Sequence, residues 1–127
     1  MRILMIGDVI GKPGRQAVSA LLPGLRQELK LDLVVANGEN AAGGFGLTPD
    51  TAQELLESGV DVLTSGTHIY DQKEIIPYLD GSMPILRPLN YPPLAPGRGY
   101  TVANNVLVVN AGGRVFVGTF DCPFRAM

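Results

Sequence analysis

The stretch LDLVVANGEN, residues 31–40, decides the fold, because an apolar run gives way there to polar residues around a glycine. Two other apolar runs end in the same way, the first at Asp8 and the third shortly before His68. Short, continuous apolar runs are typical of strands that are buried on both faces of a parallel sheet. The carboxyl ends of such strands form the edge of the sheet where ligands bind. The sequence therefore predicts an α/β fold with one site assembled from separate loops.

The composition is that of one compact domain. The chain has 127 residues, of which 46% are hydrophobic, and its formal net charge is −2. A slightly negative net charge argues against a basic surface that binds duplex DNA. No apolar stretch reaches the ~20 residues needed to cross a bilayer, and Asp8 comes too early for a signal peptide. The lone Cys122 excludes an internal disulfide and fits a reducing compartment. We therefore expect a cytoplasmic protein with no membrane partner.

The first half of the chain alternates between predicted strands and predicted helices. Pro13 can open the first helix, and Pro23 inside it predicts a kink or two short consecutive helices. Thr48 is expected to cap the second helix, which should end at Gly59. A capping box beginning with Asp71 is expected to open the third helix. The expected elements are strands at 2–7, 32–37 and 60–65, and helices at 13–29, 49–58 and 71 to about 79.

The second half of the chain is rich in proline between residues 84 and 96, which excludes a regular helix there. A β-hairpin is expected beyond this segment, and the residues from Phe120 onward give no sign of a closing helix. The expected strands are 99–103 and 105–110, joined by a turn near Asn104-Asn105, and residues 114–118 are compatible with a further strand.

The polar residues at the strand ends allow two interpretations each. Glu39 and Asn40 offer hard oxygen donors that suit Mg, Mn or Fe ions and can bridge two of them, but such tetrapeptides also form ordinary polar turns. Asp8 either belongs to the same site or caps its own turn. His68 is the only histidine and suits acid–base chemistry, unless it is structural. Asp71, three residues later, either orients His68 or caps the next helix.

The glycines near the N-terminus do not have the spacing of a phosphate loop. Gly7 and Gly11 are separated by three residues where a Walker loop has four, and Pro13 replaces the required Ser or Thr. The close glycine pair of a dinucleotide-binding fold is also missing. A metal-free nucleotide-binding fold is therefore the weakest interpretation. Arg87 and Asn90 lie in a proline-stiffened segment that either holds a phosphate or simply covers the sheet.

Four motifs occur in an order that a known family shares. They are GDVIGKPGR (7–15), NGENAAGGFG (37–46), GTHIYD (66–71) and RPLNYPP (87–93). Together they resemble the YmdB-like branch of the calcineurin-like metallophosphoesterases, which are bacterial phosphodiesterases associated with 2′,3′-cyclic nucleotides. The resemblance extends along essentially the whole chain. It implies a four-layer α/β/β/α sandwich, of which residues 1–127 are a single N-terminal domain, the βαβαβ half plus a β-hairpin.

The resemblance also implies a metal-dependent phosphodiesterase. Its cofactors would be two divalent ions, iron or manganese with magnesium as a further option. Asp8 and Asn40 would bind the first ion, Glu39 would bridge both, and Thr67 stands at the second-ion position. The implied reaction is attack on phosphorus by a metal-held hydroxide, with His68 as the proton donor to the leaving oxygen.

The substrate implied by the resemblance is a small phosphodiester or a cyclic nucleotide, and Arg87 and Asn90 are expected to bind it. Two departures from the family put activity in doubt. Thr67 replaces an asparagine, and a hydroxyl is a poorer metal ligand than an amide oxygen. Family members are also roughly twice as long and supply three further histidine ligands from their second half. Activity would therefore require a complementing C-terminal half or a homo-oligomer. The alternative is a non-catalytic module that binds nucleotide or phosphate, or that oligomerises.

Overall fold

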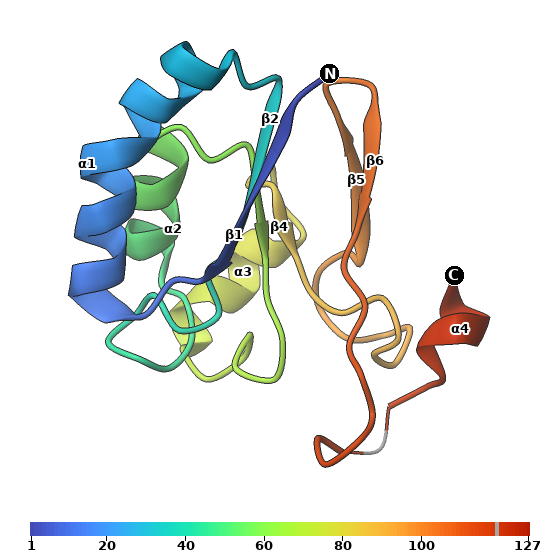
Figure 1. Ribbon diagram of the computed structural model, residues 1–127. Helices are drawn as coiled ribbons and strands as arrows, with labels where there is room; N and C mark the ends of the chain where they lie inside the picture. The colour runs from blue at the N-terminus through green and yellow to red at the C-terminus, as the bar shows by residue number, and fades with distance from the viewer. Residues whose placement is uncertain (119) are drawn as a thin grey trace.

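The computed structural model describes residues 1–118 and 120–127. A four-stranded parallel sheet carries helices on one face and a β-hairpin on the other (Figure 1). The elements in chain order are β1 (Ile3–Asp8), α1 (Gly11–Leu29), β2 (Leu33–Asn37), α2 (Pro49–Glu57), β3 (Val62–Thr64), η1 (Lys73–Ile75), α3 (Ile76–Leu79), β4 (Ile85–Leu86), β5 (Tyr100–Ala103), β6 (Val106–Val109) and α4 (Pro123–Ala126). The α/β class and the N-terminal half of a sandwich are confirmed.

The strands of the large sheet pair in the order in which they occur in the chain, β1-β2-β3-β4, and every pair is parallel. β2 and β3 are central and buried on both faces, which explains their continuous apolar sequences. β1 is the outermost strand, and its residues alternate between half-buried and exposed. The three predicted strands are thus confirmed, with ends that differ by one or two residues.

α1 is one continuous helix that begins at Gly11 and runs through Pro23 to Leu29. The alternative with two short helices is wrong. Pro23 lies on the exposed side of the helix, where solvent can satisfy the carbonyl that loses its partner. α2 begins as expected, because Thr48 accepts a hydrogen bond of 3.2 Å from the Thr51 amide in a capping box. Gly59 follows α2 with a φ of 107° and ends the helix as predicted.

The expected capping box at Asp71 is wrong. The segment after β3 forms the short 3-10 helix η1, whose N-cap is Gln72 and has no side-chain hydrogen bond. Only then does α3 begin, at Ile76, with Pro77 in its first turn. The Asp71 carboxylate turns instead toward His68, 2.6 Å from Nδ1.

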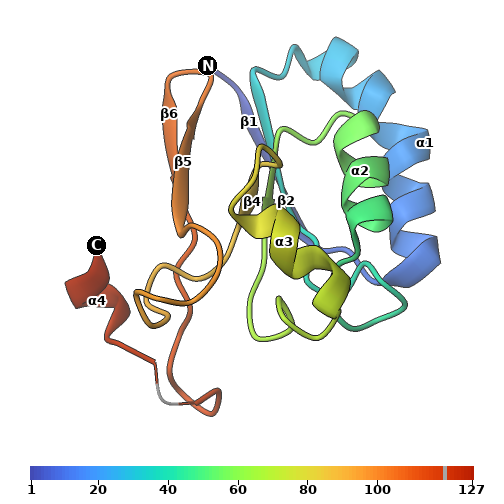
Figure 2. The ribbon, with the colours of Figure 1, turned by 180° about the vertical axis from the view of Figure 1, so that it is seen from behind.

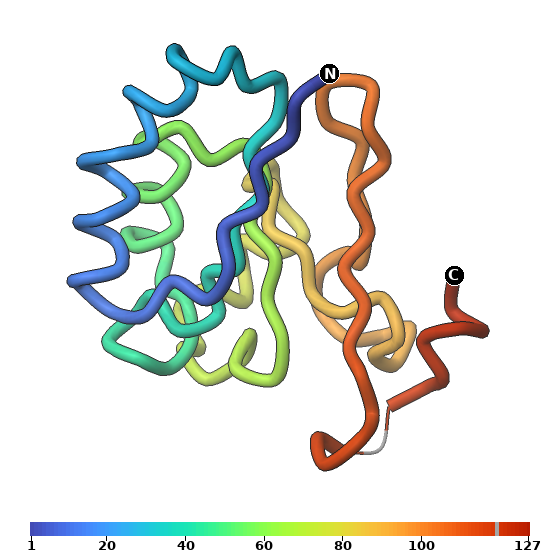
Figure 3. Tube along the Cα trace, in the orientation of Figure 1, coloured from blue at the N-terminus to red at the C-terminus, as the bar shows by residue number. Residues whose placement is uncertain are grey.

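The predicted hairpin is confirmed as β5 and β6, which turn at Asn104 and Asn105 with positive φ at both residues. From behind, the hairpin remains on the side of the sheet away from α1 and α2 (Figure 2). The tube in Figure 3 shows the hairpin turn beside the N-terminus, where Asn104 Nδ2 donates to the Asp32 carbonyl at 2.7 Å. Residues 114–118 contain no strand, and the chain ends in the one-turn helix α4, which was not expected.

Alternate residues of the central strands supply two cores. Val34, Ala36 and Leu63 pack toward the helices, in a cluster that also contains Leu22 and Leu55. The neighbouring residues on the same strands pack toward the hairpin, in a cluster made of Leu33, Val35, Val62, Leu86 and Val108. In the described part of the chain no helix has the length and apolar character needed to span a bilayer.

Candidate functional site

The carboxyl ends of β1 and β2 bring Asp8 and Asn40 together. Asn40 Nδ2 donates a hydrogen bond of 2.8 Å to Asp8 Oδ2. The Asn40 carbonyl accepts from the amides of Gly11 and Gly44, so the loop backbone fixes the position of the side chain. The other amide atom, Asn40 Oδ1, is buried and has no hydrogen-bond partner. A buried acceptor without a donor is costly, so this oxygen is suited to a positively charged ligand.

The Glu39 carboxylate lies between the ends of β2 and β3. Its Oε2 accepts from the backbone amide of His68 at 3.3 Å, and its Oε1 accepts from Asn37 Nδ2 at 3.3 Å. The carboxylate packs directly against Gly66, where an added Cβ would lie 2.6 Å from Glu39 Oε2. Glycine is therefore required at position 66 for the observed position of Glu39.

His68 is held on two sides. Its Nδ1 lies 2.6 Å from Asp71 Oδ2, and the Phe45 ring meets it edge-on at a centroid distance of 5.3 Å. About a third of the His68 side chain is exposed. Of the two interpretations of Asp71, orientation of His68 is the one that the geometry supports.

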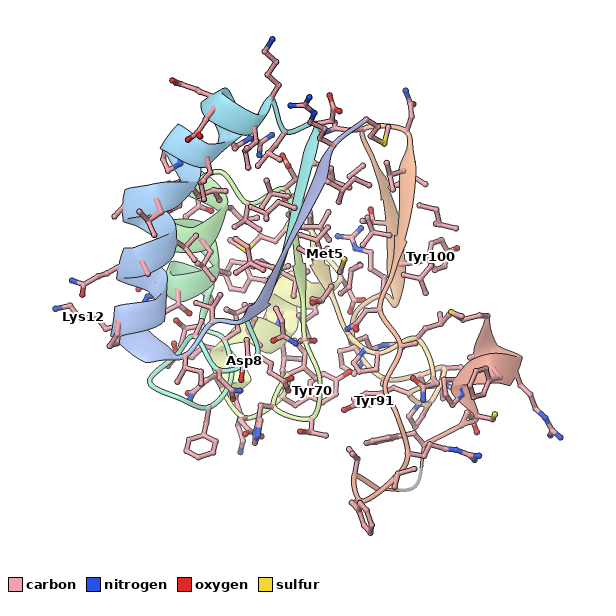
Figure 4. All side chains as sticks on the ribbon, viewed as in Figure 1. Met5, Asp8, Lys12, Tyr70, Tyr91 and Tyr100 are labelled. Atoms are coloured by element: carbon pink, nitrogen blue, oxygen red, sulfur yellow. The ribbon has the colours of Figure 1, made fainter. Side chains whose placement is uncertain are left out.

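A cavity of about 300 Å³ opens beside Glu39 and Thr67 and extends to the segment after β6. Tyr91 and Phe120 line it as a stacked pair, with ring centroids 4.5 Å apart. Figure 4 shows Asp8, Tyr70 and Tyr91 at this same edge of the sheet. Burial raises the pKa of Tyr91 above its usual value of 10.0, and the nearby Glu39 carboxylate and Tyr70 raise it further. The phenol therefore stays neutral and donates to the Gly66 carbonyl at 3.1 Å.

Arg87 and Asn90, the predicted substrate-binding residues, are both buried. Arg87 donates to the carbonyls of Ala95 and Pro88. Asn90 donates to the carbonyls of Gly112 and Asp121 and accepts from the Gly112 amide. Both side chains brace the loops around the cavity, and direct contact with a substrate stays a prediction.

The predicted ligands are of types that a metal ion accepts as part of a coordination shell, and the structure brings Asp8 and Asn40 into contact, while Glu39 and Thr67 line the cavity. Asp8, Glu39, Asn40 and Thr67 offer carboxylate, amide and hydroxyl oxygens, which are ligands that hard divalent ions accept. Among the described residues, no group of three His, Cys, Asp or Glu side chains gathers around one point. His68 bonds to Asp71 through Nδ1 and does not join these oxygens.

Several residues of the site had not been predicted. Asn37 supports Glu39 from the end of β2, and Ser65 lines the cavity from the end of β3. Like Glu39, both are polar residues at or directly after the end of an apolar strand. The same sequence pattern could therefore have predicted them. Asn110 also lines the cavity and donates to the carbonyls of Ser65 and Leu86. No sequence signal marked it, because its partners lie at the ends of other strands.

Comparison with known proteins identifies the family of the chain. The sequence model of the family described as YmdB-like protein matches residues 4–127. The chain is 44% identical over 128 residues to the 2′,3′-cyclic-nucleotide 2′-phosphodiesterase of Bacillus subtilis, a match that covers 98% of this chain and 48% of that protein.

Two solved structures have the same fold. A hypothetical protein from Thermus thermophilus superposes with a TM-score of 0.92 at 46% identity, over 99% of this chain and 50% of that one. A novel phosphatase from Mycoplasma pneumoniae superposes with a TM-score of 0.88 at 28% identity, over 97% and 47%. The chain thus spans about half the length of the relatives it matches.

Proposed function

Because the chain belongs to the YmdB-like protein family, we propose that it supplies half of a divalent-metal site for phosphodiester hydrolysis. One observation carries the proposal. Asn40 Oδ1 is buried without a partner, although the other end of the same amide is bonded to Asp8. An acceptor left unpaired next to a carboxylate is explained by a cation that both oxygens approach.

The residues have separate roles in this proposal. Asp8 and Asn40 would hold one divalent ion, Glu39 would contribute its carboxylate to both ions, and Thr67 would offer its hydroxyl to the second. Bound there, divalent ions would supply positive charge that activates water and stabilises the phosphoryl oxygens. Gly66 lets the Glu39 carboxylate approach, and the His68 amide fixes one of its oxygens.

His68 is the proposed proton donor to the leaving oxygen. In this role both ring nitrogens would carry a proton, with Nδ1–H donated to Asp71 and the Nε2 proton passed to the leaving oxygen. The proposed substrate is a small phosphodiester, a class that includes cyclic nucleotides, after the name of the Bacillus subtilis relative. Arg87 and Asn90 stay the proposed substrate-binding residues, and their hydrogen bonds to backbone carbonyls also brace the loops around the cavity.

Two measurements test the proposal. The first is the metal content of the purified protein, and the second is the rate at which it hydrolyses a bis-aryl phosphate diester in the presence of Mn²⁺. Because the relatives are about twice as long, the assay uses this chain alone and this chain mixed with the second half of a relative. We expect bound metal, and turnover that is lost in His68→Ala. Metal-free protein whose thermal stability does not respond to Mn²⁺, Fe²⁺ or Mg²⁺ would refute the metal site.

A non-catalytic module is the second candidate. The absence of a cluster of three His, Cys, Asp or Glu side chains in residues 1–118 and 120–127 favours it, as does Thr67 in place of asparagine. This interpretation predicts that a nucleotide raises the thermal stability of the protein while divalent metals leave it unchanged. The two candidates therefore differ in a single melting experiment.

A further inference from the structure

Phe45 is an aromatic side chain that the hydrophobic core does not use. It lies in the glycine-rich loop between β2 and α2, it is 62% exposed, and it belongs to neither of the two core clusters. Single exposed apolar side chains are common at protein surfaces and carry no functional meaning by themselves. The position in which the loop holds this ring is therefore the informative feature.

The backbone on both sides of Phe45 is held in place. The Gly44 amide donates a hydrogen bond of 3.0 Å to the Asn40 carbonyl, and Gln72 Nε2 donates one of 2.9 Å to the carbonyl of Phe45 itself. Gly46 has a φ of 78°, and a Cβ added there would lie 2.7 Å from Gln72 Cγ, so the loop packs closely against the segment before η1. The loop therefore presents the ring from a fixed backbone position.

The loop places the ring at the rim of the proposed hydrolytic site. Phe45 meets the His68 ring at a centroid distance of 5.3 Å and an interplanar angle of 72°. The same loop is bonded at Gly44 to Asn40, whose side chain contacts Asp8. An edge-on contact covers at most one face of a ring, and the exposed fraction of 62% leaves much of Phe45 open to solvent. A planar group attached to a phosphate near His68 can therefore lie against the open part of the ring.

A phenyl ring in this position can recognise a part of the substrate other than the phosphate. It carries no charge and donates no conventional hydrogen bond, so it adds little to the binding of a phosphoryl group or of an aliphatic ester. A nucleobase, in contrast, stacks on aromatic side chains, because every base has a π-face.

We propose that Phe45 is a specificity-determining residue that stacks on the base of a nucleotide, so that the site prefers phosphoesters of nucleosides to aliphatic phosphoesters. The inference rests on the proposed function, because the phosphate has to be held by the neighbouring residues while the base lies against the ring. Stacking on a phenyl ring tolerates every base, so the preference is for a base and not for one particular base.

Calorimetry with two phosphate monoesters tests the role of the ring. Adenosine 3′-monophosphate carries a base and glycerol 2-phosphate does not, and both are monoesters, which hydrolysis of a phosphodiester would produce and not consume. Each is titrated into the 127-residue chain in the presence of Mn²⁺. Phe45→Leu should weaken binding of the adenosine ligand by at least about fivefold, a loss typical of one base–aromatic stack. It should change the affinity for glycerol 2-phosphate by less than about twofold.

Phe45→Trp supplies a second readout. The chain contains no tryptophan, so the new indole is the only one, and its fluorescence should be quenched by adenosine 3′-monophosphate and not by glycerol 2-phosphate. The matched control is Phe124→Leu, at a phenylalanine in α4 that is 89% exposed and does not line the cavity beside Glu39. It should bind both ligands as the unmodified chain does. Because Phe45 is exposed too, circular dichroism should show that its variants remain folded.

Failure of the stacking role and failure of the proposed function give different results. If the unmodified chain binds neither ligand in the presence of Mn²⁺, the phosphate site fails and the stacking role fails with it. If it binds glycerol 2-phosphate as tightly as the adenosine ligand, or if Phe45→Leu weakens both ligands equally, the phosphate site stands and the stacking role is refuted. In the case of equal weakening, the ring acts only as a support for His68, and the ¹⁵N signals of that histidine should change in Phe45→Leu.

Discussion

Asn40 and Asp8 are 32 residues apart in the sequence, yet Asn40 Nδ2 donates a hydrogen bond of 2.8 Å to Asp8 Oδ2 across the ends of β1 and β2. The contact is directional, because it orients Asn40 Oδ1 into a buried position without a donor. The hydrogen bond thereby joins two loops that are ordinary polar turns by composition, and it leaves the amide oxygen of Asn40 unpaired.

Asp8→Ala should abolish the stabilisation of the protein by Mn²⁺, because it removes the carboxylate that we propose as a metal ligand. At a metal concentration of 100 times Kd, binding stabilises the native state by about 2.7 kcal/mol. This difference is measured by thermal unfolding with and without Mn²⁺. The control is Glu28→Ala, an exposed carboxylate near the far end of α1, which should retain the full response. An undiminished response in Asp8→Ala would rule out its role as a ligand.

Gly66→Ala should displace Glu39, because the new Cβ would lie 2.6 Å from its Oε2. Because the contacting atoms are the end of a flexible side chain, we expect Glu39 to shift with little loss of stability, and Mn²⁺ binding to weaken. Urea unfolding and metal titration measure the two effects. Gly24→Ala is the matched control, since nothing lies within 4 Å of its added Cβ in α1. That variant should be stabilised by about 0.5–1 kcal/mol and should bind metal normally.

Thr67→Asn should increase the affinity for the second metal ion. An amide oxygen is a better and longer-reaching ligand than a hydroxyl, and Thr67 is exposed at the rim of the cavity beside Glu39. We expect a gain of roughly tenfold, or ~1.4 kcal/mol, in calorimetric titration with Mn²⁺. Ser82→Asn introduces the same amide in an exposed loop and should have no effect. If Thr67→Asn and the unmodified chain bind the second Mn²⁺ ion with equal affinity, Thr67 is not a ligand of that ion.

Asp71→Ala should change the tautomer of His68. In the neutral ring, the contact of 2.6 Å favours a proton on Nδ1, where it can be donated to the carboxylate. Because His68 is the only histidine, its ¹⁵N signals in an NMR spectrum are unambiguous. We expect the Nδ1–H form in the unmodified protein and in Asp71→Asn, whose amide oxygen can still accept. The Nε2–H form should dominate in Asp71→Ala. Identical spectra would show that Asp71 does not orient the ring.

Alkaline pH should destabilise the protein through Tyr91. Burial, with Glu39 and Tyr70 nearby, raises its pKa in the folded state above 10.0. The unfolded chain therefore loses the phenolic proton first, and stability falls as the pH rises beyond about 10. Urea unfolding at about pH 8 and about pH 11 should show a smaller decline in Tyr91→Phe than in the unmodified chain. Tyr78→Phe, which removes an exposed hydroxyl, is the control. A decline unchanged by Tyr91→Phe would contradict the assignment.

The sequence was sufficient for those parts of the fold that depend on local pattern. The apolar run 33–36 forms a central strand because it is buried on both faces, and Thr48 caps α2 because its side chain needs only a neighbour three residues away. Asp71 shows the limit of such reasoning. Its position before a helix fits a cap, but a tertiary contact with His68 competes for the same carboxylate, and that contact prevails.

For the site, the sequence predicted which residues lie at the strand ends, but it did not predict how their side chains are oriented. Strand ends identified Asp8, Glu39 and Asn40, and the structure brings Asp8 and Asn40 into contact. The orientation of Arg87 and Asn90 could not be predicted, because it depends on which carbonyls the loops after β4 and β6 expose. The sequence also could not predict that the amide oxygen of Asn40 lacks a hydrogen-bond partner, because this results from the packing of two loops.

The chain-order pairing β1-β2-β3-β4 has a consequence for biosynthesis. Each new strand of the large sheet finds its only earlier partner already in place, because that partner is the strand just before it in the sequence. A polypeptide that leaves the ribosome N-terminus first can therefore extend this sheet one strand at a time, without waiting for distant segments. The loops that carry Asp8, Glu39 and His68 are thus attached to strands whose partners in the sheet all lie between β1 and β4, before the hairpin in the sequence.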